Sequence, residues 1–141
     1  MIEELSILIV EDDDVSAESI TRSIRKVSLG IELSYAENGR TAIDILKNKH
    51  PNIKLKPPYL VLLDLNMPVM SGFEFLDHVR DDPNLQDTII FILTTSNDDN
   101  DRARAYNNNV AGYMVKSSVG PQFAKLAMLL KAYREAVEPN I

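Results

Sequence analysis

The segment Tyr59-Leu60-Val61-Leu62-Leu63-Asp64 joins an uninterrupted apolar run to a carboxylate. Five consecutive apolar residues are typical of a strand that is covered on both faces, as the strands of parallel sheets are. The run Leu5–Val10 has the same character and ends against Glu11. The two segments therefore predict buried strands of a parallel sheet, each followed directly by an acid.

Apolar runs of strand length alternate with stretches of helical spacing along the whole chain. The predicted strands are Leu5–Val10, Glu32–Tyr35, Tyr59–Leu63, Ile89–Thr94 and Gly112–Val115. The predicted helices are Val15–Val27, Ala42–Lys49, Phe73–Val79, Asp98–Asn108 and Gln122–Val137. Alternation of this kind implies βαβ units, and right-handed crossovers place helices on both faces of the sheet. The predicted fold class is α/β, a doubly wound five-stranded parallel sheet.

Local signals predict where the helices end and which faces they bury. Thr41 is the expected N-cap of the second helix. The proline after His50 is expected to stop that helix, because proline disfavours the α conformation at the residue before it. The fourth helix is expected to be mostly solvated, with Ala103 and Tyr106 facing inward. His50 and His78 are expected to be solvated rather than part of a site.

The composition bounds the classes of function. A length of 141 residues fits one domain, and the absence of cysteine excludes disulfides, thiol catalysis and thiolate metal sites. A net charge of −6 argues against nucleic acid as a direct partner, since phosphate contacts need clustered lysine and arginine. No apolar run approaches the roughly 18 residues of a membrane span, and no basic-apolar signal opens the chain. The sequence therefore predicts a cytoplasmic protein that does not bind membranes.

Polar residues follow the predicted strands at their carboxyl ends, where chemistry collects in open parallel α/β sheets. These residues are Glu11, Asp12, Asp64, Thr94 and Lys116. They would form one acidic pocket with a lysine and a hydroxyl, which suits a divalent cation and a phosphoryl group. Because three carboxylates would lie close together, their repulsion is expected to raise at least one of the three pKa values.

The acidic run Glu11-Asp12-Asp13-Asp14 also has simpler explanations. Four acids in a row usually mark a solvated turn, and Asp13 or Asp14 could be no more than a helix N-cap. The acidic pair of the pocket is either Glu11-Asp12 or Asp12-Asp13. The first pair is preferred because it directly follows the strand.

Four short motifs, in this order, resemble the receiver domain of two-component response regulators. They are Val10-Glu11-Asp12-Asp13, Leu63-Asp64-Leu65-Asn66-Met67-Pro68 with Gly72, Leu93-Thr94-Thr95, and Tyr113-Met114-Val115-Lys116. The resemblance implies a flavodoxin-like, CheY-like (βα)5 fold with strand order 2-1-3-4-5. It also implies one receiver domain over residues 1–141, without an output domain. Two segments further resemble small regulators paired with bacterial phytochrome kinases, namely Asp82–Leu85 and Leu93–Ser96.

The resemblance assigns a metal site to this pocket. It makes the carboxylates of Asp12 and Asp64 and the backbone carbonyl of Asn66 ligands of Mg²⁺, with Mn²⁺ as an alternative ion. Glu11 would act mainly through water. Hard divalent cations prefer such oxygen ligands, and Mg²⁺ keeps several waters besides one or two carboxylates.

The resemblance also assigns catalytic and switching roles. Asp64 would accept the phosphoryl group, Lys116 would balance its charge, and the Thr94 hydroxyl would bind a phosphoryl oxygen. Tyr113 would be the switch, inward or outward, although a plain core aromatic is an alternative reading. Ser96 lies two residues after Thr94, where members of the family tune the lifetime of the phosphoryl group.

The partners implied are a sensor histidine kinase, of phytochrome type on the finer resemblance, or a histidine phosphotransfer protein, and a downstream protein target. The chain is not expected to be an enzyme, although it would catalyse its own phosphorylation and dephosphorylation. A homodimer is expected through the fourth helix, fifth strand and fifth helix. The residues offered by those two helices are Asp98, Asp101, Arg102, Arg104, Phe123, Lys125, Leu129, Lys131 and Tyr133.

One residue departs from the family pattern. Ser117 follows Lys116, where the family has a proline joined by a cis bond; a cis bond costs roughly 2.5–4 kcal/mol before other residues. The bond is therefore expected to be either strained cis or trans with a re-routed loop. Two other functions stay open: a pseudo-receiver scaffold that is never phosphorylated, and a phosphohydrolase that uses Asp64 as nucleophile. The second is disfavoured because Asn66 replaces the general acid of such enzymes.

Overall fold

The computed structural model describes residues 5–27, 31–67 and 69–118, and beyond them positions 128, 129, 132 and 136, which are helical. The rest of the predicted helix Gln122–Val137 lies outside the described residues. So do Phe123, Lys125, Leu126, Leu130, Lys131 and Tyr133, several of which were expected at a dimer interface.

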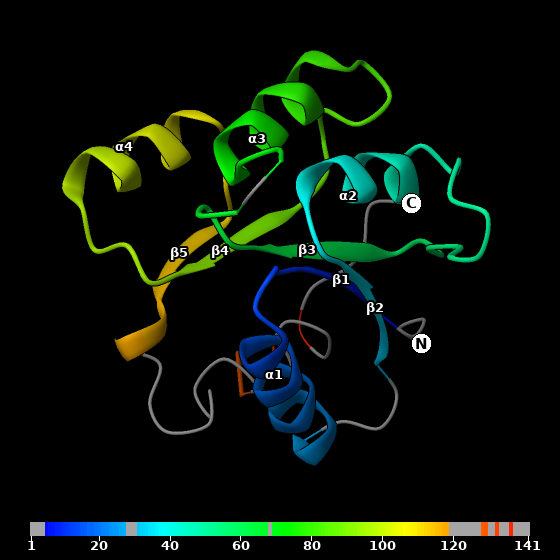
Figure 1. Cartoon of the computed structure of the whole chain (residues 1–141), viewed down its shortest axis with the longest axis horizontal. Helices are drawn as coiled ribbons and strands as arrows, with labels where there is room; N and C mark the ends of the chain where they lie inside the picture. Colours follow the sequence, from blue (N-terminus) through cyan, green and yellow to red (C-terminus); the bar gives the residue numbers. More distant parts are fainter. Residues whose placement is uncertain are drawn as a thin grey trace.

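Five parallel strands form one sheet in the order β2-β1-β3-β4-β5, which confirms the predicted topology (Figure 1). The strands are β1 (Ser6–Val10), β2 (Glu32–Ala36), β3 (Tyr59–Leu63), β4 (Ile90–Thr94) and β5 (Gly112–Val115). The helices are α1 (Asp14–Val27), α2 (Gly39–Leu46), α3 (Gly72–Asp81) and α4 (Asp99–Asn107), and the 3-10 turn η1 is Lys116–Ser118. Each strand boundary lies within one or two residues of its prediction, because apolar runs mark the buried part of a strand directly.

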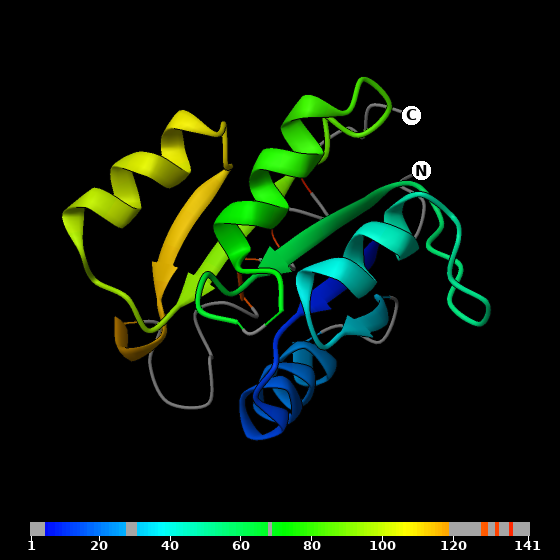
Figure 2. The same cartoon turned by 45° about the horizontal axis from the view of Figure 1, so that its top comes forward.

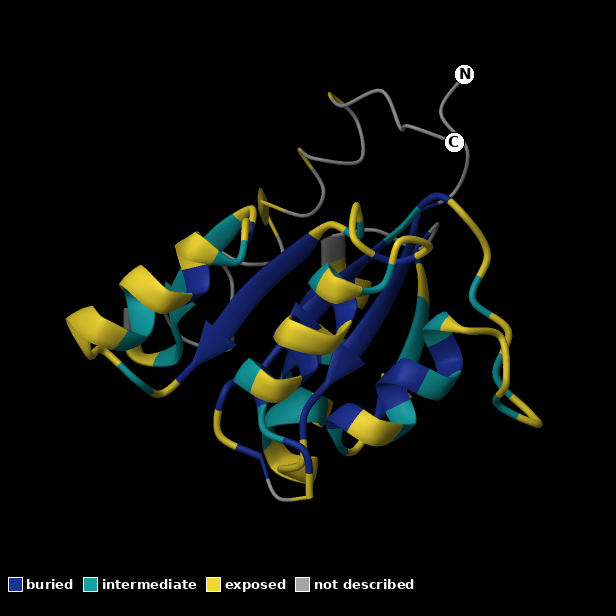
Figure 3. Cartoon of the chain, turned by 90° about the horizontal axis from the view of Figure 1, so that it is seen from above, coloured by how far each residue is buried: buried dark blue, intermediate teal, exposed yellow. Residues whose placement is uncertain are grey.

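Helices cover both faces of the sheet. Figure 1 shows α2, α3 and α4 on one face and α1 on the other. The alternation of β1 explains the two layers: Leu8 and Val10 join the core cluster under α2 and α3, whereas Ile7 and Ile9 join the cluster that holds Ile20 of α1. A strand with apolar residues on both faces can stabilise both layers. Figure 3 shows these buried strands beneath partly exposed helices.

The register of the strands sets the position of the predicted pocket. Val10 pairs with Leu63, so Glu11 and Asp64 leave the sheet at the same level. Thr94 pairs with Val115, the residue before Lys116. All strands point to the same edge of the sheet (Figure 2). Side chains that are far apart in sequence therefore converge at this edge.

The second helix and the residues after it correct three predictions. Its N-cap is Asn38, whose side chain accepts a hydrogen bond from the Thr41 amide at 2.9 Å, so Thr41 lies inside the first turn. The helix also ends at Leu46, before His50. The His50 ring is half-buried rather than solvated, since Nδ1 accepts bonds from the amides of Asn52 and Ile53. His78 is exposed, as predicted.

The fourth helix corrects another prediction. Ala105 is its fully buried residue, whereas Ala103 is exposed and Tyr106 keeps 48% of its surface. The helix is short, charged and weakly apolar, so the sequence alone does not show which face meets the sheet. Just after the helix, Asn109 has a left-handed φ of 60°, a conformation that asparagine tolerates at helix ends.

Candidate functional site

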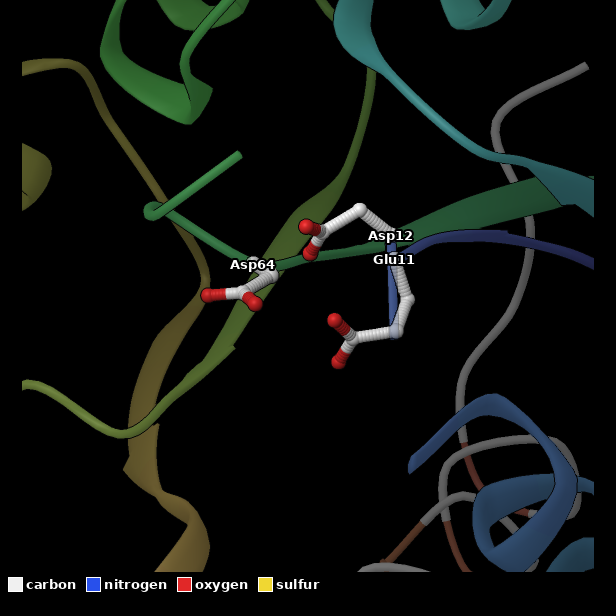
Figure 4. A group of neighbouring side chains, drawn as sticks. All are labelled: Glu11, Asp12 and Asp64. Carbon is white, nitrogen blue, oxygen red and sulfur yellow. The ribbon is translucent and has the colours of Figure 1, made fainter. Parts of the chain in front are cut away.

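Three carboxylates meet at the carboxyl edge of the sheet (Figure 4). Oxygen atoms of Glu11, Asp12 and Asp64 all lie within 4.8 Å of one another. Asp64 comes from the end of β3, and the other two residues follow β1. Glu11 and Asp64 are buried, with 7% and 6% of their surface exposed, whereas Asp12 is exposed. The preferred acidic pair, Glu11-Asp12, is therefore the pair beside Asp64.

Asp13 has a different role from the three clustered acids. Its carboxylate accepts hydrogen bonds from the Val15 amide at 3.1 Å and the Ser16 hydroxyl at 2.9 Å, so it caps α1. These bonds hold the pKa of Asp13 below its ordinary value. The capping alternative thus applies to Asp13 and not to the acids that precede it.

Backbone contacts fix the position of Asp64. The Asp64 amide donates to the Val10 carbonyl at 3.1 Å, which ties it to β1. A Cβ atom added at Gly72 would lie 2.5 Å from the Asp64 carbonyl oxygen and 2.6 Å from the Leu65 Cα. The α3 helix can approach the end of β3 this closely only because residue 72 has no side chain.

The Asp64 carboxylate is held on both oxygens. Oδ1 accepts hydrogen bonds from the Thr94 hydroxyl and from the backbone amide of Asn66, both at 3.1 Å. Oδ2 lies 3.5 Å from Lys116 Nζ. Three predicted site residues thus contact the Asp64 carboxylate directly: Asn66, Thr94 and Lys116.

Lys116 makes its shortest contact with Glu11 rather than with Asp64. Its Nζ lies 2.5 Å from Glu11 Oε1 and also donates to Ser16 Oγ at 3.5 Å. Burial alone would lower the pKa of Lys116. The hydrogen bond that Lys116 donates to Glu11, together with the charges of Asp64 and Glu11, outweighs burial, so the Lys116 pKa is raised and the group stays charged. Lys116 is therefore no ordinary surface lysine.

Glu11 is the carboxyl whose protonation is shifted. Burial, with further contributions from the hydrogen bond and charge of Asp64, raises its pKa from 4.5 to about 7, against the opposing effect of Lys116. One pKa of the pocket is thus raised, as expected, but the largest cause is burial rather than repulsion between the carboxylates. Three carboxylates facing one ammonium leave a negative site, and oxygen-rich negative sites fit a hard divalent cation.

The loop after Lys116 does not need proline to aim this lysine. The cis peptide bond found among the described residues joins Pro57 and Pro58, so the Lys116–Ser117 bond is trans. Residues 116–118 form the η1 turn, with no left-handed φ among them. Since Lys116 still reaches Asp64, the departure at Ser117 does not displace it.

Ser96 connects the pocket to α4 and β5, a role that the sequence did not predict. Its amide donates to Thr94 Oγ1 at 3.4 Å, its hydroxyl donates to Asp101 Oδ2 at 2.6 Å, and its carbonyl accepts from the Tyr113 hydroxyl at 3.0 Å. The Arg102 guanidinium lies over the Tyr113 ring, 5.5 Å from its centroid. These contacts join residues by tertiary proximity, so no local spacing signals them.

Comparison with known proteins decides the family. The family model of the response regulator receiver domain matches residues 7–127. The chain belongs to this receiver family. The receiver is 34% identical over 110 residues to the probable methanogenesis regulatory protein FilR2 of Methanothrix harundinacea, covering 78% of this chain and 70% of FilR2. It is 30% identical over 111 residues to response regulator Rcp1 of Synechocystis, covering 79% of this chain and 76% of Rcp1.

Solved structures share the fold of the receiver. The Mn²⁺-bound form of Rcp1 superposes with a TM-score of 0.84 at 26% identity, over 96% of this chain and 99% of Rcp1. The phosphorylated cyanobacterial phytochrome response regulator RcpA superposes with a TM-score of 0.80 at 25% identity, over 93% of this chain and 94% of RcpA. The flavodoxin-like, CheY-like fold predicted from the motifs is thus confirmed. Within the described ranges, no helix has the length and apolar character needed to cross a bilayer.

Proposed function

We propose that the receiver accepts a phosphoryl group on Asp64 from the phosphohistidine of a kinase or phosphotransfer protein, in a reaction that needs a divalent cation. The observation that carries the proposal is the setting of Asp64. This buried carboxylate touches a hydroxyl and an ammonium, and two further carboxylates lie within 4.8 Å. Such a setting can present a nucleophile, a charge partner and a cation to one phosphoryl group.

In the transfer step, an Asp64 carboxylate oxygen bonds to phosphorus while the bond from phosphorus to the donor imidazole nitrogen breaks. That nitrogen keeps the electron pair. The Thr94 hydroxyl, which now donates to Asp64 Oδ1, can donate to a phosphoryl oxygen instead. Lys116 lies 3.5 Å from Asp64 Oδ2 and can move its charge toward the transferred oxygens.

The carboxylates of Asp12 and Asp64 would hold the cation, with the Asn66 carbonyl as a further ligand and Glu11 acting through water. Mg²⁺ is the proposed ion and Mn²⁺ the alternative; the Rcp1 structure was determined with Mn²⁺. When bound, the cation supplies charge that neutralises the phosphoryl oxygens. Lys116 pairs most closely with Glu11, and among the described residues no basic side chain forms an ion pair with Asp12.

The proposed receiver later returns the phosphoryl group to water. A water oxygen bonds to phosphorus, the bond to Asp64 breaks, and inorganic phosphate leaves. The chain would thus catalyse its own dephosphorylation without being an enzyme that turns over a separate substrate. Ser96, beside Thr94, is the proposed modulator of this step.

The kinase is proposed to be of phytochrome type, because RcpA is a phytochrome response regulator. A cytoplasmic location would give the receiver access to such a kinase. The signal would pass to a downstream protein through the α4–β5 surface, with Thr94 and Tyr113 connecting that surface to Asp64. A homodimer through α4, β5 and the C-terminal segment would use the same surface, which offers Arg102 and Arg104 beside Asp98 and Asp101.

The first test is the intact mass of the receiver after treatment with acetyl phosphate and Mg²⁺. We expect one added phosphoryl group, lost in Asp64→Asn and lost when the cation is chelated. Asp13→Asn is the matched control, because Asp13 lies next to the cluster but only caps α1. Labelling that persists in Asp64→Asn would place the acceptor elsewhere.

Two other outcomes would favour the competing functions. A wild-type chain that neither takes the label nor binds Mg²⁺ would be a pseudo-receiver scaffold. Steady release of phosphate from p-nitrophenyl phosphate over many turnovers would indicate a phosphohydrolase.

A further inference from the structure

The loop that joins β3 to α3 carries Asn66, whose backbone faces the pocket. Its amide donates to Asp64 Oδ1 at 3.1 Å, and its carbonyl is the proposed further ligand of the cation. Asn66 itself is exposed, so burial does not hold its backbone in place. The position of this carbonyl therefore depends on what holds the rest of the loop.

Two methionines anchor the loop on the core. Met67 and Met70 keep 9% and 7% of their surface exposed, and both belong to the apolar cluster under α2 and α3. Met70 lies against Gly39, the first residue of α2 (Figure 2). A Cβ atom added at Gly39 would lie 2.9 Å from Met70 Cγ and 3.0 Å from both its Sδ and its carbonyl oxygen. We call this contact between Gly39 and Met70 the seat of the loop; it can form only because residue 39 has no side chain.

Val69 shows that the loop is held under strain. Its φ is 67°, in the left-handed region, which a β-branched residue adopts only at a cost in free energy. The valine keeps 80% of its surface exposed, so its own burial does not offset this cost. The neighbouring Met70 is buried, and the seat fixes the backbone that directly follows Val69. Packing of Met70 therefore balances the strain, and a looser seat would let Val69 return to a negative φ.

We propose that Gly39 and Met70 are positioning residues of the metal site, because their contact sets the loop backbone and with it the Asn66 carbonyl. Both act through the loop rather than on the cation itself. The inference deepens the proposed function and rests on the cation site proposed there. Strain makes the arrangement conditional on the seat: when the seat is loosened, Val69 relaxes and the backbone of Asn66 moves away from Asp64.

The first test measures binding of Mg²⁺ from the shift of the Asn66 amide in ¹H–¹⁵N spectra during a titration with MgCl₂. Met70→Ala empties the seat, and we expect the Kd for Mg²⁺ to rise roughly ten-fold, as for other residues that orient metal ligands. Met70→Leu keeps a buried apolar side chain of similar volume and should bind Mg²⁺ like the wild type. Gly39→Ala crowds the seat from the other side and should raise the Kd too, which gives a second variant should Met70→Ala not fold.

Leu85→Ala is the matched control. Leu85 belongs to the same apolar cluster and is as buried as Met70, with 6% of its surface exposed, but it follows α3 rather than β3. Its truncation should lower the free energy of unfolding as Met70→Ala does and leave the Kd for Mg²⁺ unchanged. An unchanged Kd in Met70→Ala, or an equal rise in Leu85→Ala, would overturn the proposal.

A rescue by Val69→Asn separates positioning from packing. Asparagine tolerates a left-handed φ better than valine, so this change relieves the strain without altering the seat. Alone, it should raise the melting temperature and leave the Kd near the wild-type value. Combined with Met70→Ala, it should recover most of the lost Mg²⁺ affinity, because the loop then gains nothing by leaving the left-handed conformation. A double variant that binds Mg²⁺ no better than Met70→Ala would contradict the role of the strained loop.

A metal-free measurement separates the seat from the proposed function. Three-bond couplings across the N–Cα bond of Val69 report the sign of its φ. We expect a positive φ in the wild type and a mixture with negative φ in Met70→Ala. A wild type that binds no Mg²⁺ would contradict the proposed cation site, and these couplings would still decide whether the seat sets the loop. A negative φ in the wild type, or an unchanged positive φ in Met70→Ala, would overturn the seat.

Discussion

Gly72 shows how one missing side chain positions Asp64. The atoms that a Cβ would meet are backbone atoms of Asp64 and Leu65, which cannot rotate away as a side chain does. Glu11 shows the opposite case, a side chain that is present but buried. Burial disfavours its charged form and raises its pKa to about 7.

Gly72→Ala should displace the end of β3 from α3. We expect the free energy of unfolding to fall by about 1–3 kcal/mol, as for other overpacked core positions, and Asp64 labelling by acetyl phosphate to slow. Gly112→Ala is the control, because its Cβ would meet only the Phe91 ring, at 3.1 Å. Urea unfolding and intact-mass labelling measure the two effects. Equal losses in both variants would show that the Asp64 backbone is not the cause.

Glu11 should make the metal-free protein less stable as the pH rises. Its folded pKa, about 7, exceeds the ordinary 4.5, so the folded chain holds the proton more tightly. Stabilisation is therefore full below pH 4.5 and is lost on the way to pH 7, by at most about 3 kcal/mol. The raised pKa of Lys116 contributes throughout this window, because it is lost only at alkaline pH.

The measurement is urea unfolding of wild type and Glu11→Gln at pH 5 and pH 8 with the metal chelated. Glutamine cannot titrate, so the difference between the two proteins isolates Glu11 from the other carboxylates. Its advantage over glutamine should shrink from pH 5 to pH 8. A constant difference would mean that Glu11 has an ordinary pKa.

Among the elements, α3 is joined to two distant loops by a single side chain. Arg80 donates to four carbonyls: Asn108 at 2.6 Å, Gln86 and Thr88 at 2.8 Å, and Asn109 at 3.1 Å. These carbonyls belong to the loops that enter β4 and β5. The C-terminal end of α4 is therefore held by Arg80 of α3, whereas its first turn is bound to Ser96.

Arg80→Ala should remove the donor that binds these four carbonyls. We expect a loss of about 2–4 kcal/mol in the free energy of unfolding, since bonds to charged groups are among the stronger ones. Arg22→Ala is the control: Arg22 pairs with Glu18 on exposed α1, where its side chain keeps 72% of its surface. That change should cost less than about 0.5 kcal/mol. Similar losses in both variants would show that the four bonds add nothing to stability.

At the scale of the whole molecule, the apolar core lies on the two faces of the sheet, and the charged site lies at its carboxyl edge. Two apolar layers pack on its faces, and the acids gather at the carboxyl ends of the strands. Folding brings Glu11, Asp12 and Asp64 together against their mutual repulsion. A ligand that binds only the assembled site should stabilise the fold by mass action.

Magnesium should therefore raise the melting temperature of the receiver, with a gain of about 2.7 kcal/mol at a concentration one hundred times Kd. Removing the cation with a chelator should reverse the gain. Asp12→Asn should abolish the effect, whereas Asp98→Asn, which alters the cap of α4, should keep it. Thermal unfolding with and without MgCl₂ measures this directly. An equal gain in both variants would place the bound cation outside the pocket.

Much of the fold and most of the pocket could be predicted from the sequence, since both depend on strong local signals. Short apolar runs such as Tyr59–Leu63 are typical of strands covered on both faces, and residues that end parallel strands share one edge of the sheet. The helix faces were harder: Ala105, rather than Ala103 or Tyr106, is buried in α4, because β5 and not a helical apolar pattern selects that face.

The amino-acid sequence by itself determined the strand-helix alternation, the acidic edge and the family, because each depends on residue type and order along the chain. Only the tertiary structure decided that Lys116 pairs most closely with Glu11, that its bond to Ser117 is trans, and that Arg102 and Ser96 hold Tyr113. Those outcomes depend on distances between residues from different elements. Distances of this kind follow from strand register and helix packing, which local sequence does not encode.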